Sequence, residues 1–111
     1  MGYKPFSIAD GQLPATKGTL YVVPENTTLR ITSIVLVNTG AGANTCNLYI
    51  QRDGTNSRRI MPVDNSIAAS GELIIVTPIS LETDDLIEGD AATVSEVDYV
   101  ISGEQYISDK T

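Results

Sequence analysis

The chain of 111 residues contains no histidine and no tryptophan, and it has one cysteine, Cys46, and one phenylalanine. Without histidine, the chain lacks the commonest general base and metal ligand of proteins. A single cysteine excludes an internal disulfide and disfavours a secreted disulfide scaffold. Because Cys46 lies in a run that alternates apolar and polar residues, we expect it to be a small buried side chain.

Long apolar segments and basic runs are also missing. No stretch approaches the ~20 apolar residues of a membrane span, and the N-terminus has no apolar signal core. Nucleic-acid binding needs a basic face that neutralises phosphates, and the seven lysines and arginines form no such run. We therefore expect a soluble protein made in a reducing cytoplasm, with neither a membrane nor a nucleic acid as partner.

Signatures of catalysis are absent as well. The chain has no G-x-S-x-G elbow and no Ser-x-x-Lys motif, and no histidine is present to activate a serine or threonine. Gly40-Ala41-Gly42 is followed by neither a helical pattern nor a lysine, so it indicates a turn rather than a phosphate-binding loop. We predict that the protein is not an enzyme and binds no cofactor.

Charge of one sign fills the last third of the chain. Residues 72–111 contain ten carboxylates and one cation, whereas residues 1–71 contain four carboxylates and six cations. The densest acidic group is Glu82, Asp84, Asp85, Glu88 and Asp90. Its spacing does not match a calcium-binding loop, so we predict solvated turn residues and no metal site, with calcium binding as the alternative.

Short alternating runs separated by turn residues dominate the remainder. No window of ten or more residues has an apolar period of 3.6, so at most one helical turn is expected, in residues 64–71. The predicted pattern is seven or eight short strands, typical of a single antiparallel β-sandwich of the jelly-roll type. The expected strands are residues 20–23, 27–38, 44–51, 57–61, 73–77, 86–87, 94–101 and 105–107, with a hairpin turn at Asp53-Gly54.

The first sixteen residues are interrupted by Pro5, Gly11 and Pro14 and show no sustained period. We expect an extended N-terminal arm in residues 1–16 and a β-sandwich domain in residues 17–111. The arm carries isolated apolar side chains, which either pack on their own domain or dock on a neighbour. For the second case, the candidate interface residues are Tyr3, Phe6 and Ile8.

The basic residues Arg52, Arg58 and Arg59 are the only cationic concentration. They are either outward side chains of a strand pair or contacts to an acidic patch on an adjacent subunit, because arginine–carboxylate pairs suit protein interfaces. The candidate acidic partners are Asp84, Asp85 and Glu88. A carbohydrate-binding module is the alternative from another class, although five tyrosines and one phenylalanine supply few stacking rings.

Four segments in order resemble small β-sandwich virion proteins of tailed bacteriophages. They are GTLYVVPENTT (residues 18–28), SIVLVNTG (33–40), LETDDLIEGD (81–90) and YVISG (99–103). The resemblance covers roughly residues 17–107. The chain departs from the family pattern at Asp84-Asp85, where the usual residues are glycine and aspartate.

This resemblance implies a non-enzymatic structural protein of the virion, made in the cytoplasm of a bacterial host. Relatives decorate or cement the capsid, often as trimers, or belong to tail, neck and baseplate assemblies. The implied partners are copies of the chain itself and the major capsid protein or tail proteins. We expect a capsid decoration or cement protein, with a tail accessory protein as the alternative.

Overall fold

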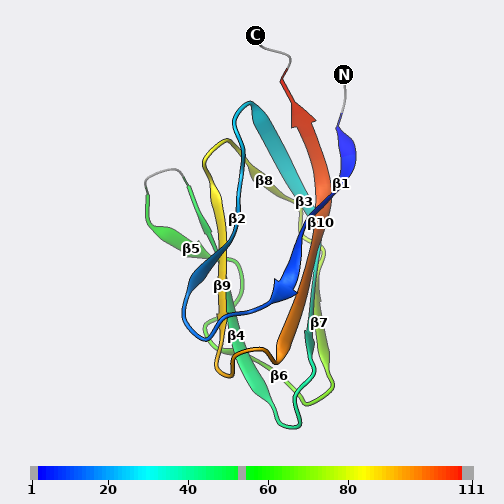
Figure 1. Cartoon of the computed structure of the whole chain (residues 1–111), viewed down its shortest axis with the longest axis vertical. Coiled ribbons are helices and arrows are strands. Elements are labelled where there is room, and N and C mark those ends of the chain that lie inside the picture. Colours follow the sequence, from blue (N-terminus) through cyan, green and yellow to red (C-terminus); the bar gives the residue numbers. More distant parts are fainter. Residues whose placement is uncertain (1–2, 53–54, 109–111) are drawn as a thin grey trace.

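The computed structural model describes residues 3–52 and 55–108, and these residues form ten strands and no helix. The strands build two five-stranded antiparallel sheets that face each other (Figure 1). Sheet A contains β1 (Lys4–Gln12), β10 (Val97–Ile107), β3 (Thr27–Asn38), β7 (Glu72–Ile75) and β8 (Ile79–Leu81). Sheet B contains β2 (Gly18–Val22), β9 (Leu86–Ala91), β4 (Asn44–Gln51), β5 (Ser57–Arg59) and β6 (Asn65–Ile67).

The strand order is that of a jelly roll. In sheet A the order is β1-β10-β3, followed by β7 and β8, which pair with different parts of β3. In sheet B the order is β2-β9-β4, followed by β5 and β6, which both pair with β4. Because two of the eight jelly-roll positions are each split into two short strands, ten strands occupy eight places. The predicted all-β antiparallel sandwich is confirmed.

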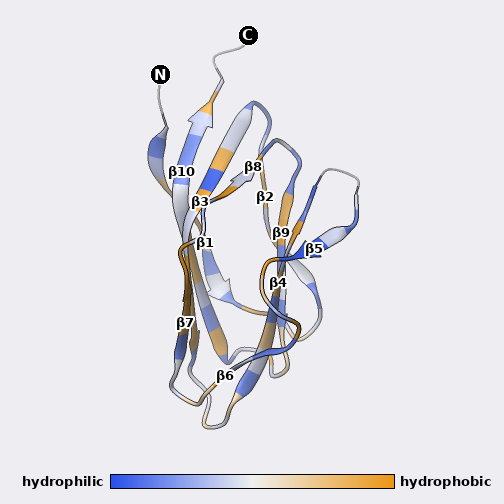
Figure 2. Cartoon of the chain, turned by 180° about the vertical axis from the view of Figure 1, so that it is seen from behind, coloured by the Kyte–Doolittle hydropathy of each residue, from blue (hydrophilic) through white to orange (hydrophobic). Residues whose placement is uncertain are grey.

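The core lies between the sheets and follows the alternation of the strands (Figure 2). Cys46, Leu48 and Ile50 of β4 are buried, as are the inward residues of β10. Burial of each large side chain of this kind contributes about 1.5–3 kcal/mol. The completely or nearly completely buried large side chains are Leu13, Val23, Leu29, Ile31, Ile34, Leu36, Leu48, Leu81, Ile87, Val97 and Ile101.

A β-bulge at Thr32 changes which side chains of β3 face the core. Ser33 pairs with Ser102 and Ile31 pairs with Gly103, so Thr32 is the extra residue. In an uninterrupted strand, Ile31 and Val35 would lie on the same face. The bulge instead brings Leu29, Ile31, Ile34 and Leu36 into the core and turns Val35 and Val37 to the outer face of sheet A.

The predicted extended arm is largely a strand. Residues 4–12 form β1, which pairs with β10 along the edge of sheet A, so the expectation of an irregular arm is wrong for these residues. Without β1, the long strand β10 would present its unpaired backbone groups at the sheet edge. A bulge at Ile8 lets this strand follow β10 despite Pro5 and Gly11.

Three smaller differences concern short elements. Residues 65–67 form β6, where a loop or single helical turn was expected, and β8 was not predicted. The expected separate strand 105–107 is the end of β10. The hairpin signal at Asp53-Gly54 lies outside the described residues. Within residues 3–52 and 55–108, the structure has no helix long and apolar enough to cross a membrane.

Candidate functional site

The candidate residues of the N-terminal segment have different environments. Ile8 is 5% exposed and belongs to the core, and Phe6 packs partly buried against that core. Tyr3 is exposed, with its ring 5.9 Å from the ring of Tyr106 and the Arg30 guanidinium 4.7 Å from its centroid. The alternative left open by the sequence is therefore settled for residues 4–12, which pack on their own domain.

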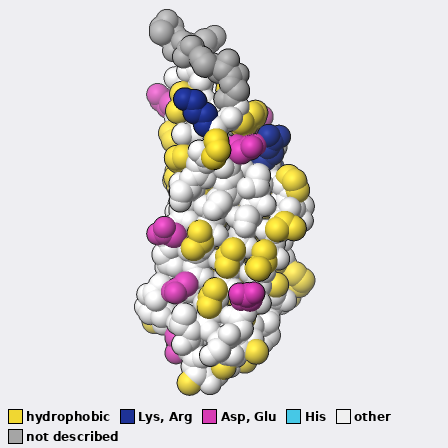
Figure 3. Space-filling view, turned by 90° about the vertical axis from the view of Figure 1, so that its right-hand side faces the viewer, with side chains coloured by type: hydrophobic (Ala, Val, Ile, Leu, Met, Phe, Trp, Pro, Cys, Tyr) yellow, Lys and Arg dark blue, Asp and Glu magenta, His cyan; other side chains and the backbone are white. Residues whose placement is uncertain are grey.

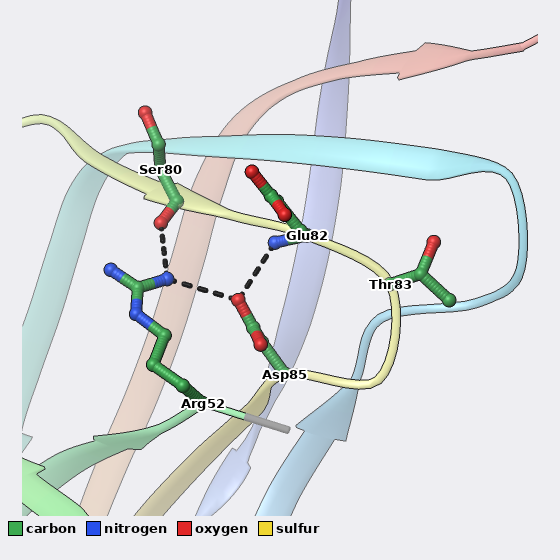
Figure 4. A pocket seen from close by; sticks show the side chains of 5 residues that line it. All are labelled: Arg52, Ser80, Glu82, Thr83 and Asp85. Carbon is green, nitrogen blue, oxygen red and sulfur yellow. Dashed lines mark hydrogen bonds and ion pairs between the residues drawn. The ribbon is translucent and has the colours of Figure 1, made fainter. Parts of the chain in front are cut away.

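Arg52 and Asp85 contact each other within the chain. Arg52 Nη1 lies 3.0 Å from Asp85 Oδ2 and donates a second hydrogen bond to the Ser80 carbonyl at 2.7 Å (Figure 4). The same Asp85 oxygen accepts a hydrogen bond from the Glu82 amide at 2.8 Å. Since Asp85 is buried and bonded in this way, it stabilises the turn that connects β8 to β9.

An open pocket of about 490 Å³ surrounds this ion pair, lined also by Glu82 and Thr83. Asp84 lies in the adjacent turn with a φ of 72°, a left-handed conformation that aspartate tolerates. Glu82 and Asp85 line this pocket, whereas Glu88 and Asp90 accept hydrogen bonds from side chains of sheet B. Within the described parts of the chain, no three histidine, cysteine or acidic side chains meet as metal ligands.

Glu88 and Arg59 lie in a polar network on the outer face of sheet B. Glu88 is 8% exposed and accepts a hydrogen bond of 2.5 Å from the Ser57 hydroxyl. The Arg59 guanidinium donates to Asn47 Oδ1 at 2.6 Å and lies 5.0 Å from the centroid of the Tyr49 ring. Burial, assisted by the nearby Asp90 carboxylate, raises the pKa of the Tyr49 hydroxyl despite the opposing effect of Arg59.

Arg58 differs from the other two candidate arginines. Its side chain is exposed on the edge strand β5, and it makes no hydrogen bond or ion pair with the residues that the structure describes. Val63, in the segment that follows β5, is 60% exposed. We call Arg58, Arg59 and Val63 the β5 surface. It combines cations with an exposed apolar side chain.

Cys46 is buried, as expected from its alternating run. Burial, with a smaller contribution from Asp90, raises the pKa of its thiol to about 11. The thiol donates to the Asn65 carbonyl at 3.7 Å. Because only the thiolate is a strong nucleophile, this cysteine is a packing residue rather than a reactive one.

The outer face of sheet A is the surface that the sequence reasoning missed. Strand pairing places Asp10, Val100, Val35 and Ile74 in one row across the sheet. The next row contains Gln12, Asp98, Val37 and Glu72. Val76, the first residue after β7, is exposed like Ile74 and continues the alternation of that strand. We call these five apolar and three acidic residues the sheet A face: Val35, Val37, Ile74, Val76, Val100, Asp10, Glu72 and Asp98.

This face exposes large apolar side chains to solvent. Ile74 is 52% exposed, Val76 is 68% exposed and Val100 is 44% exposed. In Figure 3 apolar side chains gather over the middle of this side, acidic groups flank them, and lysine and arginine appear only toward its upper end. The sequence signal was the pair of continuous apolar runs at residues 34–37 and 73–76, which have apolar side chains on both sides of the strand.

No protein-family model and no curated protein matches the chain. Its fold is similar to known viral structures. A chain of the acidic stable capsid structure of Helicobacter pylori bacteriophage KHP30 matches with a TM-score of 0.52 and 8% identity, covering 98% of this chain and 95% of that one. A chain of infectious bursal disease virus, Gx strain, matches with a TM-score of 0.50 and 13% identity. The alignment covers 94% of this chain and 32% of the bursal disease virus chain, so at this low identity what is shared is the jelly-roll fold.

Proposed function

We propose that the chain is a non-enzymatic structural protein of a tailed-phage virion, acting as a decoration or cement protein on the head shell. In this role its jelly-roll subunit binds shell proteins through its surface and braces them against one another. The mechanism needs no catalytic group. It needs a stable two-sheet body and an exposed surface that becomes buried on docking.

The observation that carries this proposal is a jelly-roll body with an uncovered apolar face. Its fold aligns over nearly all of both chains with a chain of similar length in a phage capsid structure. Exposed apolar patches rimmed by polar groups are typical of protein-binding surfaces. The sheet A face has this composition, and seven of its eight residues lie in paired strands rather than in a loop.

Two further features support a purely structural role. The buried polar side chains of the described residues all have hydrogen-bond partners, so no orphaned group points to a missing ligand. The pocket beside Arg52 and Asp85 is open, and these two of its three charged side chains neutralise each other. We propose that copies assemble as trimers on the shell.

The experiment is immunogold labelling of virions of the phage that encodes the chain, combined with deletion of its gene. Label on the head, and mutant heads that release DNA at a lower temperature than the parent, are the expected results. Label confined to the tail would replace the cement role by a tail accessory role. Absence of the protein from purified virions would refute a structural role altogether.

A further inference from the structure

We propose that copies of this chain associate head to tail, with the sheet A face of one copy packed against the β5 surface of the next. This inference goes beyond the cement role, because the contact forms between copies of the chain and needs no shell protein. It assigns a partner to each of two surfaces that the single chain leaves uncovered.

The first step is that the sheet A face exposes apolar side chains that association would bury. Ile74, Val76 and Val100 leave about half of their surface in water, and they lie side by side with the half-buried Val35 and Val37. Removing apolar surface from water stabilises by about 25 cal/mol per Å². The sides of the molecule extend over at least 50 by 20 Å, enough for the ~800 Å² per partner of a standard interface.

The second step is that the face does not suit a copy of itself. Asp10, Glu72 and Asp98 lie in the same two rows as the valines, and no lysine or arginine shares those rows. Packing two such faces together would bring six carboxylates into one interface. Like charges placed opposite each other oppose association, so a symmetric contact through this face is disfavoured.

The third step is that the β5 surface is complementary. Arg58 is exposed on β5 and has no partner within residues 3–52 and 55–108, and Val63, in the segment that follows β5, is also exposed. Arginine pairs well with carboxylates at interfaces. β5 projects from the side of the molecule opposite to β7 and β10 (Figure 1). One copy therefore presents the cationic surface on one side and the acidic apolar face on the other.

A contact between two different surfaces of identical chains is heterologous. It either closes into a ring or continues as a filament, depending on the rotation between neighbours. Because the two surfaces lie on opposite sides of the subunit, copies form an open row unless each contact turns the next copy by a third of a turn, which closes the proposed trimer. In both cases the assembly should dissociate as salt is added, because the carboxylate–arginine pairs are partly exposed.

The experiment is sedimentation equilibrium of the purified protein from micromolar to millimolar concentration, for the wild type and for Asp98→Arg, Arg58→Glu and Glu25→Arg. Glu25 lies exposed in the turn between β2 and β3, so Glu25→Arg is the matched control for a charge reversal away from both surfaces. We expect concentration-dependent association of the wild type and of the control. Each reversal at the contact should weaken association at least tenfold, although Asp98→Arg lowers the net negative charge of the chain.

Mixing the two charge-reversal variants is the decisive measurement. When the Asp98→Arg and Arg58→Glu proteins are mixed, each contact between unlike variants joins opposite charges. An equimolar mixture should therefore associate, at least into alternating pairs and rows, where neither variant does alone. Val76→Ser should also weaken association, which tests the apolar part of the face. Circular dichroism melting curves should match the wild type for the variants at the exposed Arg58, Glu25 and Val76. Asp98→Arg should melt slightly lower, because Asp98 is half-buried and accepts a hydrogen bond from Gln12.

Three outcomes would overturn the proposal. They are a wild type that remains monomeric at all concentrations, reversals that behave like the Glu25→Arg control, and association that Asp98→Arg strengthens while Arg58→Glu leaves it unchanged. The last result would identify a symmetric contact through sheet A. Absence of the protein from virions would refute the cement role without affecting any of these measurements, so the two proposals fail separately.

Discussion

Replacing Gly103 by alanine tests the packing of β10 against the bulge of β3. Gly103 lies in β10 opposite Ile31, beside the extra residue Thr32. A Cβ atom added to Gly103 would lie far inside van der Waals contact with the Arg30 carbonyl oxygen, and 3.1 Å from Ile31 Cα. Both neighbours are backbone atoms of a central strand, so neither can rotate away.

The magnitude follows from what must move. To admit the methyl group, β10 and β3 would have to separate near the bulge and lose two or three ladder hydrogen bonds. At about 1 kcal/mol per hydrogen bond, with a further 1–3 kcal/mol for overpacking, we expect a loss of roughly 3–5 kcal/mol in the free energy of unfolding. Strand propensity alone predicts that Gly103→Ala would raise the free energy of unfolding, because alanine in a strand is favoured over glycine by about 0.5–1 kcal/mol.

Two other glycines serve as matched controls. A Cβ at Gly42 would meet nothing within 4 Å, so Gly42→Ala should change stability by less than about 1 kcal/mol, toward stabilisation. A Cβ at Gly40 would meet only the flexible carboxylate of Glu96, which can swing aside. Gly40→Ala should therefore cost little, at most the hydrogen bond of 3.3 Å that Asn44 donates to Glu96.

Urea denaturation and thermal melting followed by circular dichroism measure the series. We expect the order Gly42→Ala, Gly40→Ala, Gly103→Ala in increasing cost. A loss of 3 kcal/mol corresponds to a fall of roughly 10 °C or more in Tm for a chain of this size. If Gly103→Ala melts with the wild type, the close approach of β10 to β3 at the bulge is wrong.

Three further predictions concern other parts of the chain. Removal of residues 2–12 should lower Tm strongly, because it removes β1 and a buried core isoleucine; an unchanged Tm with weaker assembly would mean that this strand serves a neighbour instead. Cys46 should resist thiol-specific reagents at mildly alkaline pH in the native protein and react at once in denaturant, since its pKa is raised to about 11; rapid native labelling would contradict its burial. Asp85→Ala should destabilise by about 2–3 kcal/mol, more than Arg52→Ala, because Asp85 is buried and holds the turn whereas Arg52 is half exposed; equal costs in chemical denaturation would argue against that role.

The strand pattern could be read from the sequence where alternation is local. Residues 27–38 and 44–51 were predicted with the bounds that the structure has for β3 and β4, and the inward residues Cys46, Leu48 and Ile50 are buried. Side-chain alternation depends only on the extended backbone, so each strand carries its own signal. The same signal predicted a two-sheet sandwich and excluded a helical body.

The N-terminal segment shows where a local signal fails. Pro5 and Gly11 predict an irregular arm, but pairing with β10, about ninety residues away in the chain, makes residues 4–12 a strand. Which side chains of β3 face the core cannot be predicted from local alternation for a similar reason. The bulge at Thr32 forms because Gly103 on the neighbouring strand leaves room for it. Since the two residues are far apart in the sequence, the pattern around Thr32 does not predict the bulge.

For the charged residues, too, some features follow from the sequence and others only from the tertiary structure. The sequence by itself determined that the cations lie early and the carboxylates late, and that the chain has no histidine. Only the tertiary structure decided that Asp85 contacts Arg52, that Arg58 pairs with no side chain among the described residues, and that Asp98 lies beside exposed valines. Composition and alternation are properties of neighbouring residues, whereas ion pairs and surfaces depend on which distant strands the fold places side by side.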